Sequence, residues 1–196
     1  MSDCPYLFVG LGNPGVEYSL TRHNIGYLCV DSIAKNYNFP PFQAKKNGAF
    51  AKSTIHKHDV ILFKPTTYMN NSGLPVHEVS AYYDIPPEHI FVFHDDLDLA
   101  PGKIKVKYGG GNAGHNGLKD LDHHLSPNYW RVRIGIGRPP GIAQSTTNYV
   151  LGRLSQHDQE WVASMLHEIA FHVDLLFDAD PQKFAAQIMQ DLHQKS

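Results

Sequence analysis

Hydrophobic positions along the chain recur at two spacings, which predict strands alternating with helices. Short apolar runs, such as Tyr6 to Leu11, are typical of strands. Apolar residues three and four apart, as in Ile25, Leu28, Cys29 and Ile33, are typical of a buried helix face. The predicted strands cover 6–11, 49–56, 60–64, 90–94, 103–108 and 130–136, and the predicted helices cover 22–36, 71–83, 116–125, 156–178 and 181–193.

This order of elements predicts the fold class. Strands that alternate with helices, together with a hairpin around Lys57-His58-Asp59, indicate an α/β protein with a twisted mixed β-sheet. Helices are expected on both faces of the sheet, in three layers (αβα). We find no repeat or long linker, so we expect one domain over 1–196. The run from Ser155 to Asp158 is typical of a helix start with a capping box.

Composition narrows the class of protein. The chain of 196 residues has 42% hydrophobic residues, which suits a globular protein with a full core. Its cysteines, Cys4 and Cys29, form no CxxC pair, which favours a reducing compartment. No signal peptide is recognisable, and no apolar run approaches the roughly 20 residues of a membrane span. We therefore expect a soluble, cytoplasmic protein that does not associate with membranes.

The formal net charge of −2 conceals one basic segment. Residues 103–138 contain seven Lys and Arg against two Asp, a balance of +5. The balance is −3 over 1–102 and −4 over 139–196. A local basic segment in a mildly acidic protein suggests a local anionic partner, although a solvated charged edge explains it equally well.

The basic residues alternate with apolar ones in two predicted strands. Period-2 alternation places each basic set on one strand face, opposite the apolar face, where it suits phosphate oxygens. An ordinary half-exposed strand shows the same alternation. The basic positions are Lys103, Lys105 and Lys107 in one strand and Arg131 and Arg133 in the other.

A histidine at the start of the first predicted helix is a candidate general base. Thr21 is a plausible N-cap, so His23 would lie in the first turn. There the helix dipole favours the neutral imidazole that a base requires. Asp95 could accept a hydrogen bond from one ring nitrogen and fix the tautomer. The alternatives are a surface histidine after a turn and an ordinary turn carboxylate.

Polar side chains also gather in loops that follow predicted strands. Loops at the carboxyl ends of strands in α/β sheets meet in one crevice, although 66–73 and 109–117 could leave opposite ends. Asn13, Asn70 and Asn116 could hold peptide-like or ribose groups there, or could simply form Asx turns and caps. The glycines of 109–117 fit a loop approaching a ligand, a structural hairpin or a mobile lid.

Three other site types fit the sequence less well. Gly10 to Gly15 matches the GxGxxG pattern of dinucleotide sites, but Pro14 and the residues after it delay the helix. No GxSxG elbow indicates a catalytic serine. A metal site lacks an HExxH or comparable spacing. The metal ligands it would use are His94, Asp95, Asp96, Asp98, His123 and His124.

Five motifs follow one another along the chain. They are Thr21-Arg22-His23-Asn24, Thr66-Thr67-Tyr68-Met69-Asn70, His94-Asp95-Asp96-Leu97-Asp98, Gly114-His115-Asn116-Gly117-Leu118-Lys119-Asp120 and Arg131-Val132-Arg133-Ile134-Gly135-Ile136-Gly137. In order and spacing they resemble the motifs of the bacterial-type peptidyl-tRNA hydrolases. The resemblance runs from Val9-Gly10-Leu11-Gly12-Asn13-Pro14-Gly15 to the region of Val150-Leu151-Gly152. One departure is Asn112-Ala113, where many members carry histidine and glycine, and it bears on the mobility of the loop.

The resemblance implies a monomeric hydrolase that needs no cofactor, metal or protein partner. It would cleave the ester between a peptide and the terminal ribose of tRNA. His23 would be the base, Asp95 would support it, and Asn13 would distinguish N-acylated from free aminoacyl substrates. The substrate contacts it implies are Tyr18, Tyr68, Asn70 and Asn116, with Met69 and His115 as pocket neighbours. Lys105, Lys107 and Arg133 would hold phosphates of the acceptor stem. A non-catalytic RNA-binding module on the same fold is the alternative.

Overall fold

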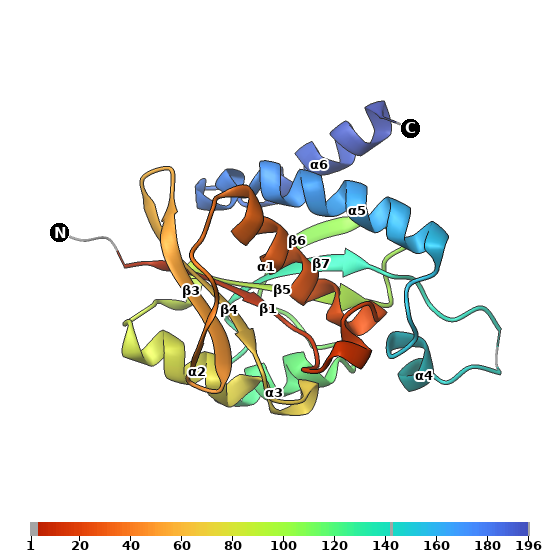
Figure 1. The fold of residues 1–196 in the computed structure, drawn as a ribbon, viewed down its shortest axis with the longest axis horizontal. Helices are drawn as coiled ribbons and strands as arrows, with labels where there is room; N and C mark the ends of the chain where they lie inside the picture. Colours follow the sequence, from red (N-terminus) through yellow and green to blue (C-terminus); the bar gives the residue numbers. More distant parts are fainter. Residues whose placement is uncertain (1–3, 142, 196) are drawn as a thin grey trace.

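The computed structural model describes residues 4–141 and 143–195. Within them lies a seven-stranded mixed sheet in the order β2-β3-β4-β1-β5-β7-β6 (Figure 1). Its four central strands are parallel: β4 (His58–Pro65), β1 (Tyr6–Gly10), β5 (Ile90–Asp96) and β7 (Trp130–Gly135). Antiparallel strands complete both edges: β2 (Gln43–Lys45), β3 (Gly48–Ile55) and β6 (Ile104–Tyr108).

Helices cover both faces of this sheet, which confirms the expected three layers (Figure 1). One face carries α1 (Ile25–Asn36), α5 (Gln156–Phe171) and α6 (Gln182–Gln194). The other carries α2 (Gly73–Tyr82) and α3 (Asn116–Leu125). The short helix α4 (Thr146–Val150) lies beyond one end of the sheet (Figure 1).

Alternating side chains of the central strands divide the apolar core between the two faces. Phe8, Phe91 and Phe93 pack in the cluster that includes α1, α5 and α6. Val9 and Val92 pack in the cluster under α2 and α3. Both sets are buried, which explains why the parallel strands read as nearly continuous apolar runs.

The predicted helix over 156–178 is wrong in its last seven residues. The helix α5 ends at Phe171, and a 3-10 turn, Val173–Phe177, follows. Val173 is buried in the core, and the ring of Phe177 packs against that of Phe8. Packing against the sheet therefore overrides continued helix formation. The capping box at the start of α5 is confirmed, with Ser155 and Asp158 bonded in both directions.

Other predicted elements differ in detail. The hairpin forms, but Ile55 pairs with His58, so its turn lies slightly before the predicted position. The edge strand β2 and the helix α4 were not predicted at all. Both are too short for a hydrophobic period to show in the sequence.

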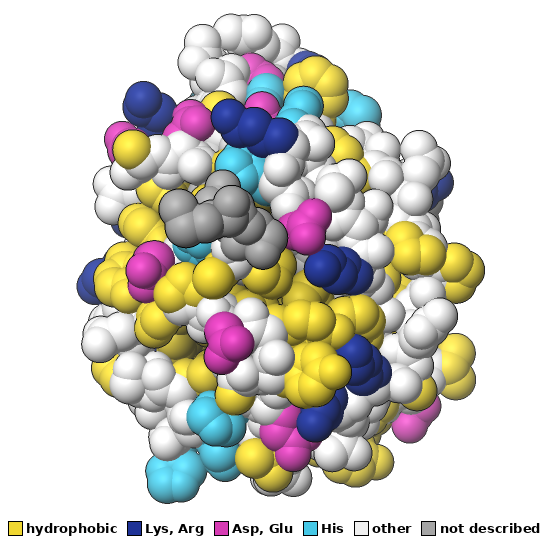
Figure 2. Space-filling model, turned by 90° about the vertical axis from the view of Figure 1, so that its left-hand side faces the viewer, with side chains coloured by type: hydrophobic (Ala, Val, Ile, Leu, Met, Phe, Trp, Pro, Cys, Tyr) yellow, Lys and Arg dark blue, Asp and Glu magenta, His cyan; other side chains and the backbone are white. Residues whose placement is uncertain are grey.

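Among the described residues, side chains of both charges are mixed over the surface at the end of the molecule away from α4 (Figure 2). Figure 2 shows acidic, basic and histidine side chains interspersed there among hydrophobic ones. Among the described helices, none has the length and apolar character needed to cross a membrane.

Glycines allow α1 to approach the sheet backbone to backbone. A Cβ atom on Gly26 would lie 2.3 Å from the carbonyl oxygen of Phe93 and 2.6 Å from the nitrogen of Leu11. A Cβ atom on Gly10 would lie 2.3 Å from the carbonyl oxygen of Gly26. The start of α1 is thus held directly against the carboxyl ends of β1 and β5.

We predict that Gly26→Ala destabilises the protein by about 1–3 kcal/mol, because the methyl group collides with fixed backbone atoms. The free energy of urea-induced unfolding measures this effect. Gly111→Ala is the matched control, since no atom lies within 4 Å of its added Cβ, and it should change stability by about 0.5 kcal/mol or less. Equal stability of the two variants would contradict the close packing of α1.

Candidate active site

His23 lies in a short 3-10 turn, Arg22–Asn24, that leads directly into α1. The helix itself begins at Ile25, three residues later than predicted. Thr21 does not cap it through its side chain, because its hydroxyl donates to the carbonyl oxygen of Tyr18 (2.9 Å). The predicted side-chain cap is therefore wrong, although the predicted position of His23 at the entrance to the helix holds.

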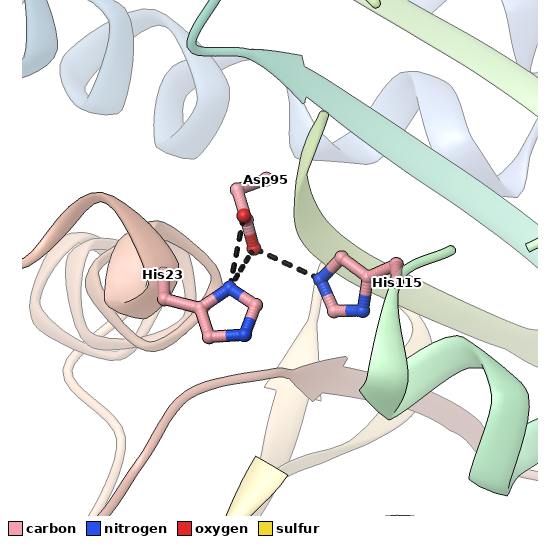
Figure 3. A group of neighbouring side chains, drawn as sticks. All are labelled: His23, Asp95 and His115. Atoms are coloured by element: carbon pink, nitrogen blue, oxygen red, sulfur yellow. Dashed lines mark hydrogen bonds and ion pairs between the residues drawn. The ribbon is translucent and has the colours of Figure 1, made fainter. Parts of the chain in front are cut away.

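Asp95 lies between two imidazole rings that come from distant parts of the chain (Figure 3). Both of its carboxylate oxygens are 2.9 Å from Nδ1 of His23, and Oδ1 is also 2.9 Å from Nε2 of His115. The carboxylate is only 2% exposed. A buried charge is tolerated when it is paired and hydrogen-bonded, which both rings provide.

The hydrogen bonds fix the tautomers of both rings. Nδ1 of His115 accepts from the backbone N–H of Leu118 (3.3 Å), so the proton of a neutral His115 ring lies on Nε2 and is donated to Asp95. His23 likewise donates Nδ1–H to Asp95. The lone pair of its Nε2 is then available on the side of the ring away from the carboxylate.

The pKa of His23 is raised, contrary to the expectation from the helix dipole. Burial alone would lower this pKa, but the charge of Asp95 and the hydrogen bond to it raise it above the ordinary value. Burial would raise the pKa of Asp95, but the two adjacent imidazoles hold it well below its usual range. The adjacent carboxylate thus outweighs the end of the helix.

His94 is a third histidine beside this group, and it stays neutral. Its ring is buried and lies edge-on to that of His115, with centroids 5.2 Å apart. Nδ1 donates to the carbonyl oxygen of Asp95 (2.8 Å), while Nε2 has no partner within the described residues. Burial, followed by the proximity of His115, lowers the pKa of His94 to about 3.

Asn13 is held in place by a neighbouring asparagine. The Asn24 side chain accepts from the backbone N–H of Asn13 (2.8 Å) and donates to its carbonyl oxygen (2.9 Å). Oδ1 of Asn13 accepts from the backbone N–H of Met69 (2.7 Å). The loop after β1 is therefore tied to the loop after β4, and the Nδ2 group of Asn13 is its remaining donor.

These side chains line one cavity of about 720 Å³. It also contains the other candidate residues except Lys105, which is exposed elsewhere on β6. Of the three asparagines, Asn13 is buried, whereas Asn70 and Asn116 are exposed. The candidate residues that line the cavity are Asn13, Tyr18, His23, Tyr68, Met69, Asn70, Asp95, Lys107, His115, Asn116 and Arg133.

The basic rows of β6 and β7 lie on the strand face opposite the core, but they are not all free. Arg131 is only 2% exposed; it pairs with Asp122 (2.9 Å) and donates to the carbonyl oxygen of Gly111. It anchors a loop, so the expectation that it contacts phosphate is wrong. Arg133 lines the cavity and pairs with Asp96 (2.8 Å). Lys107 lines it without an ion pair in the described part of the chain.

The segment 109–115 forms one wall of the cavity by running along the sheet. The N–H of Gly109 donates to the carbonyl oxygen of Tyr129, at the start of β7, whereas His115 meets Asp95 near the end of β5. The loops at 66–73 and 109–117 begin at opposite ends of the sheet, as the sequence analysis allowed. The segment 109–115 runs back along the sheet and brings the loop at 109–117 next to the loop at 66–73. Ala113 has φ +49, a conformation that costs a residue with a Cβ about 1–2 kcal/mol.

Comparisons with known proteins agree with these motifs. A family model described as Peptidyl-tRNA hydrolase matches residues 7–196. The chain belongs to the peptidyl-tRNA hydrolase family. The peptidyl-tRNA hydrolase of Beijerinckia indica is 47% identical over 182 residues, which are 93% of this chain and 91% of that protein. That of Granulibacter bethesdensis is 44% identical over 190 residues, 96% and 97% of the two chains.

A solved structure of the same family has the same fold. The crystal structure of peptidyl-tRNA hydrolase from Acinetobacter baumannii superposes with a TM-score of 0.87 at 41% identity, covering 96% of this chain and 95% of that one. The resemblance drawn from the five motifs is thus confirmed, as is the three-layer fold.

The sequence analysis gave no structural role to several residues that build the site. Asn24, which lies behind the cavity wall and holds Asn13, was read only as part of a motif. His94, which lines the cavity, was read as part of a motif and as a metal ligand. Arg138 and the residues of α4 add a further wall, which includes Thr146 and Val150. The one sequence signal for α4 was Ser145, whose side chain caps the helix by accepting from the N–H of Asn148 (3.2 Å).

The group His23, Asp95 and His115 has the ligand types and the separations of a metal site, with its ligand atoms within 4.8 Å of one another. The hydrogen bonds oppose this use. A neutral His115 could bind a metal through Nε2 only with its proton on Nδ1, where it would face the N–H of Leu118. The arrangement favours proton transfer over metal binding.

We predict that His94→Asn makes stability less dependent on pH below neutrality. The unfolded chain takes up a proton on His94 near pH 6.5 and the folded protein only near pH 3, so the wild-type protein loses stability as pH falls through this window. The variant keeps a donor for the carbonyl of Asp95 but does not titrate. The slope of its free energy of unfolding against pH should be shallower than that of the wild type by up to about 1.4 kcal/mol per pH unit.

Urea unfolding at a series of pH values between roughly 4 and 7 measures how the free energy of unfolding of each protein changes with pH. The contribution of the His23–Asp95 pair is present in both proteins and cancels in the difference. Parallel stability curves for the two proteins would show that His94 is not held neutral.

Proposed function

We propose that this chain hydrolyses the ester that links a peptide, or an N-acylated amino acid, to the 3′-terminal ribose of tRNA. Its membership of the peptidyl-tRNA hydrolase family supports the activity. The observation that carries the catalytic part is the orientation of His23. Its Nδ1–H is donated to Asp95, and no hydrogen bond to Nε2 is found among the described residues, so Nε2 can act as the base.

In the proposed reaction, Nε2 of His23 takes a proton from water as the oxygen attacks the ester carbonyl carbon. Asp95 stabilises the imidazolium that forms, because its carboxylate already holds the Nδ1–H. The tetrahedral intermediate then collapses, the bond to the ribose oxygen breaks, and His23 returns the proton to that oxygen. The donated bond from His115 keeps Asp95 ionised and fixed.

The carboxamides supply neutral donors around the ester. Asn70 and Asn116 line the cavity and are candidates for stabilising the oxyanion, since a side-chain amide can donate to it. The Nδ2 group of Asn13, which has no hydrogen-bond partner in the part of the chain that the structure describes, can donate to the acyl carbonyl of an N-acylated substrate. A free aminoacyl group offers an ammonium donor there instead, which explains a preference for blocked substrates.

The tRNA part of the substrate requires aromatic and cationic contacts. Tyr18 and Tyr68 line the cavity and suit stacking with the single-stranded 3′ end, and Met69 lies beside them in the wall. Lys107 and Arg133 face the same cavity from β6 and β7, and Lys105 extends the basic row outside it. Contacts of this kind go to phosphates, so they would accept many tRNA sequences.

We propose, as the family resemblance implies, that the enzyme acts as a monomer in the cytoplasm, where tRNA is used. The alternative, an RNA-binding module without catalysis, would retain the basic row but would not need a buried His23–Asp95 pair. An assay of N-acyl-aminoacyl-tRNA hydrolysis separates the two functions. A protein that only binds RNA would shift tRNA in a gel but would produce no free tRNA from this substrate.

We predict that His23→Ala lowers kcat for N-acyl-aminoacyl-tRNA by about 10²–10⁴-fold, because it removes the base. Binding of uncharged tRNA in a gel-shift assay should change little. Unchanged turnover in this variant would remove His23 from the role of base. Loss of tRNA binding together with turnover would instead indicate a folding defect.

The pH profile of the wild-type enzyme and of Asp95→Asn provides the accompanying control. Activity requires neutral His23, and the raised pKa places the acid limb of kcat/KM above pH 6.5. Asp95→Asn removes the negative charge that raises this pKa, so the limb should move to lower pH while kcat falls. A limb at the same pH in both proteins would mean that another group titrates there.

We predict that Lys107→Ala weakens tRNA binding and lowers the slope of log K against log salt by about 1, as expected for one lost phosphate contact. Filter binding at several salt concentrations measures both quantities. Lys35→Ala is the matched control, because this exposed lysine lies in the last turn of α1, away from the cavity. Identical salt slopes for Lys107→Ala and the wild type would exclude the phosphate contact.

A further inference from the structure

A second group of metal-binding side chain types lies where α5 packs against α6, on a face of the sheet away from α3 (Figure 1). Glu168 is in α5, His172 follows one helical turn later, and Asp191 comes from α6. Nε2 of His172 is 2.7 Å from Oδ2 of Asp191 and 3.6 Å from Oε2 of Glu168. None of these residues takes part in the proposed hydrolysis.

The separations are close to those that a tetrahedral zinc ion imposes. Zinc–ligand distances of about 2.0–2.1 Å place neighbouring ligand atoms about 3.3 Å apart. The three ligand atoms here all lie within 4.8 Å of one another. Small side-chain rotations would therefore bring them onto one ion, with the fourth position left for water.

The hydrogen bonds around His172 permit this use, in contrast to those around His115. No hydrogen bond to Nδ1 of His172 is found in the described residues, so the ring can carry its proton there. Nε2–H of His172 donates to Oδ2 of Asp191 (2.7 Å) in the structure. With the proton moved to Nδ1, Nε2 would offer its lone pair to a cation lying between it and the two carboxylates, as a metal ligand requires.

Outer contacts hold the two carboxylates in position. Oδ1 of Asp191 accepts from Nε2 of Gln187 (3.0 Å), which leaves Oδ2 for the ion. Oε1 of Glu168 accepts from Nζ of Lys195 (2.5 Å), which leaves Oε2. Glu168 is only 3% exposed, so its charge depends on such partners. Hydrogen bonds from neighbouring side chains to the ligating groups orient the ligands in metal sites in this way.

We propose that Glu168, His172 and Asp191 form a Zn²⁺ site that ties α6 to α5. One imidazole with two carboxylates suits zinc, whereas Mg²⁺ and Ca²⁺ prefer six or more oxygen ligands. The site joins the last helix to the body of the protein through three side chains. Its role is structural and independent of the hydrolytic reaction, so failure of either proposal leaves the other standing.

The test is a titration of EDTA-treated full-length protein with Zn²⁺ against a chromophoric chelator. We expect one tightly held ion per chain and a melting temperature that rises by roughly 5–10 °C with Zn²⁺ at about 100 times its Kd. Amide exchange in α6 should slow when zinc is bound. A crystal grown with Zn²⁺ should show an anomalous peak between Oε2 of Glu168, Nε2 of His172 and Oδ2 of Asp191.

Variants assign the ion to these side chains. His172→Ala and the isosteric Asp191→Asn should each weaken zinc binding by at least about 100-fold, and Gln187→Ala by about 10-fold. His167→Ala is the matched control, since this exposed histidine lies on the same helix next to Glu168 but outside the group, and it should bind zinc like the wild type.

Two results would overturn the proposal. Equal zinc affinity of the wild type, His172→Ala and Asp191→Asn would mean that the group is a metal-free ion-pair cluster only. Binding that is lost in His115→Asn and kept in His172→Ala would place the ion at Asp95 instead. Circular dichroism of each variant checks that it is folded.

Discussion

The buried carboxylate of Asp95 is the constraint on which the rest of the site depends. A carboxylate that is 2% exposed would cost several kcal/mol if it were left unpaired, and here two imidazole rings donate to it. This requirement fixes the tautomers of both rings. The same carboxylate raises the pKa of His23. It therefore holds the base in place, but it also makes the base easier to protonate near neutral pH.

The fold satisfies this requirement by bringing three separate segments to one point. β5 is a central strand, and its carboxyl end delivers Asp95. Gly10 and Gly26 let α1 approach closely enough for the preceding turn to place His23 beside it. The wall at 109–115 returns along β7 from the far end of the sheet and brings His115 to the other side. A shift of either histidine would leave the buried carboxylate with one imidazole donor instead of two.

Much of this arrangement could be predicted from local sequence, and the failures share one cause. The central strands were visible because burial on both faces makes them continuously apolar, and the His23–Asp95 pair followed from motifs in adjacent loops. The direction of the His23 pKa shift was wrong because the helix dipole is local, whereas the carboxylate that outweighs it comes from residue 95. Arg131 was misjudged for the same reason, since Asp122 and Gly111 become its partners only after folding.

The two groups of histidine and carboxylate illustrate how a hydrogen bond on the far side of a ring selects its chemistry. Both contain side chains of the types that can bind metals, with ligand atoms at similar separations. At Asp95, the N–H of Leu118 occupies Nδ1 of His115, so its Nε2 must carry a proton and the group is suited to holding and moving protons. At Asp191, no hydrogen bond to Nδ1 of His172 is found within residues 4–141 and 143–195, so the proton can move from Nε2 to Nδ1 and Nε2 can then offer a lone pair to a cation. Composition and distance do not separate the two cases, whereas the backbone donor beside one ring does.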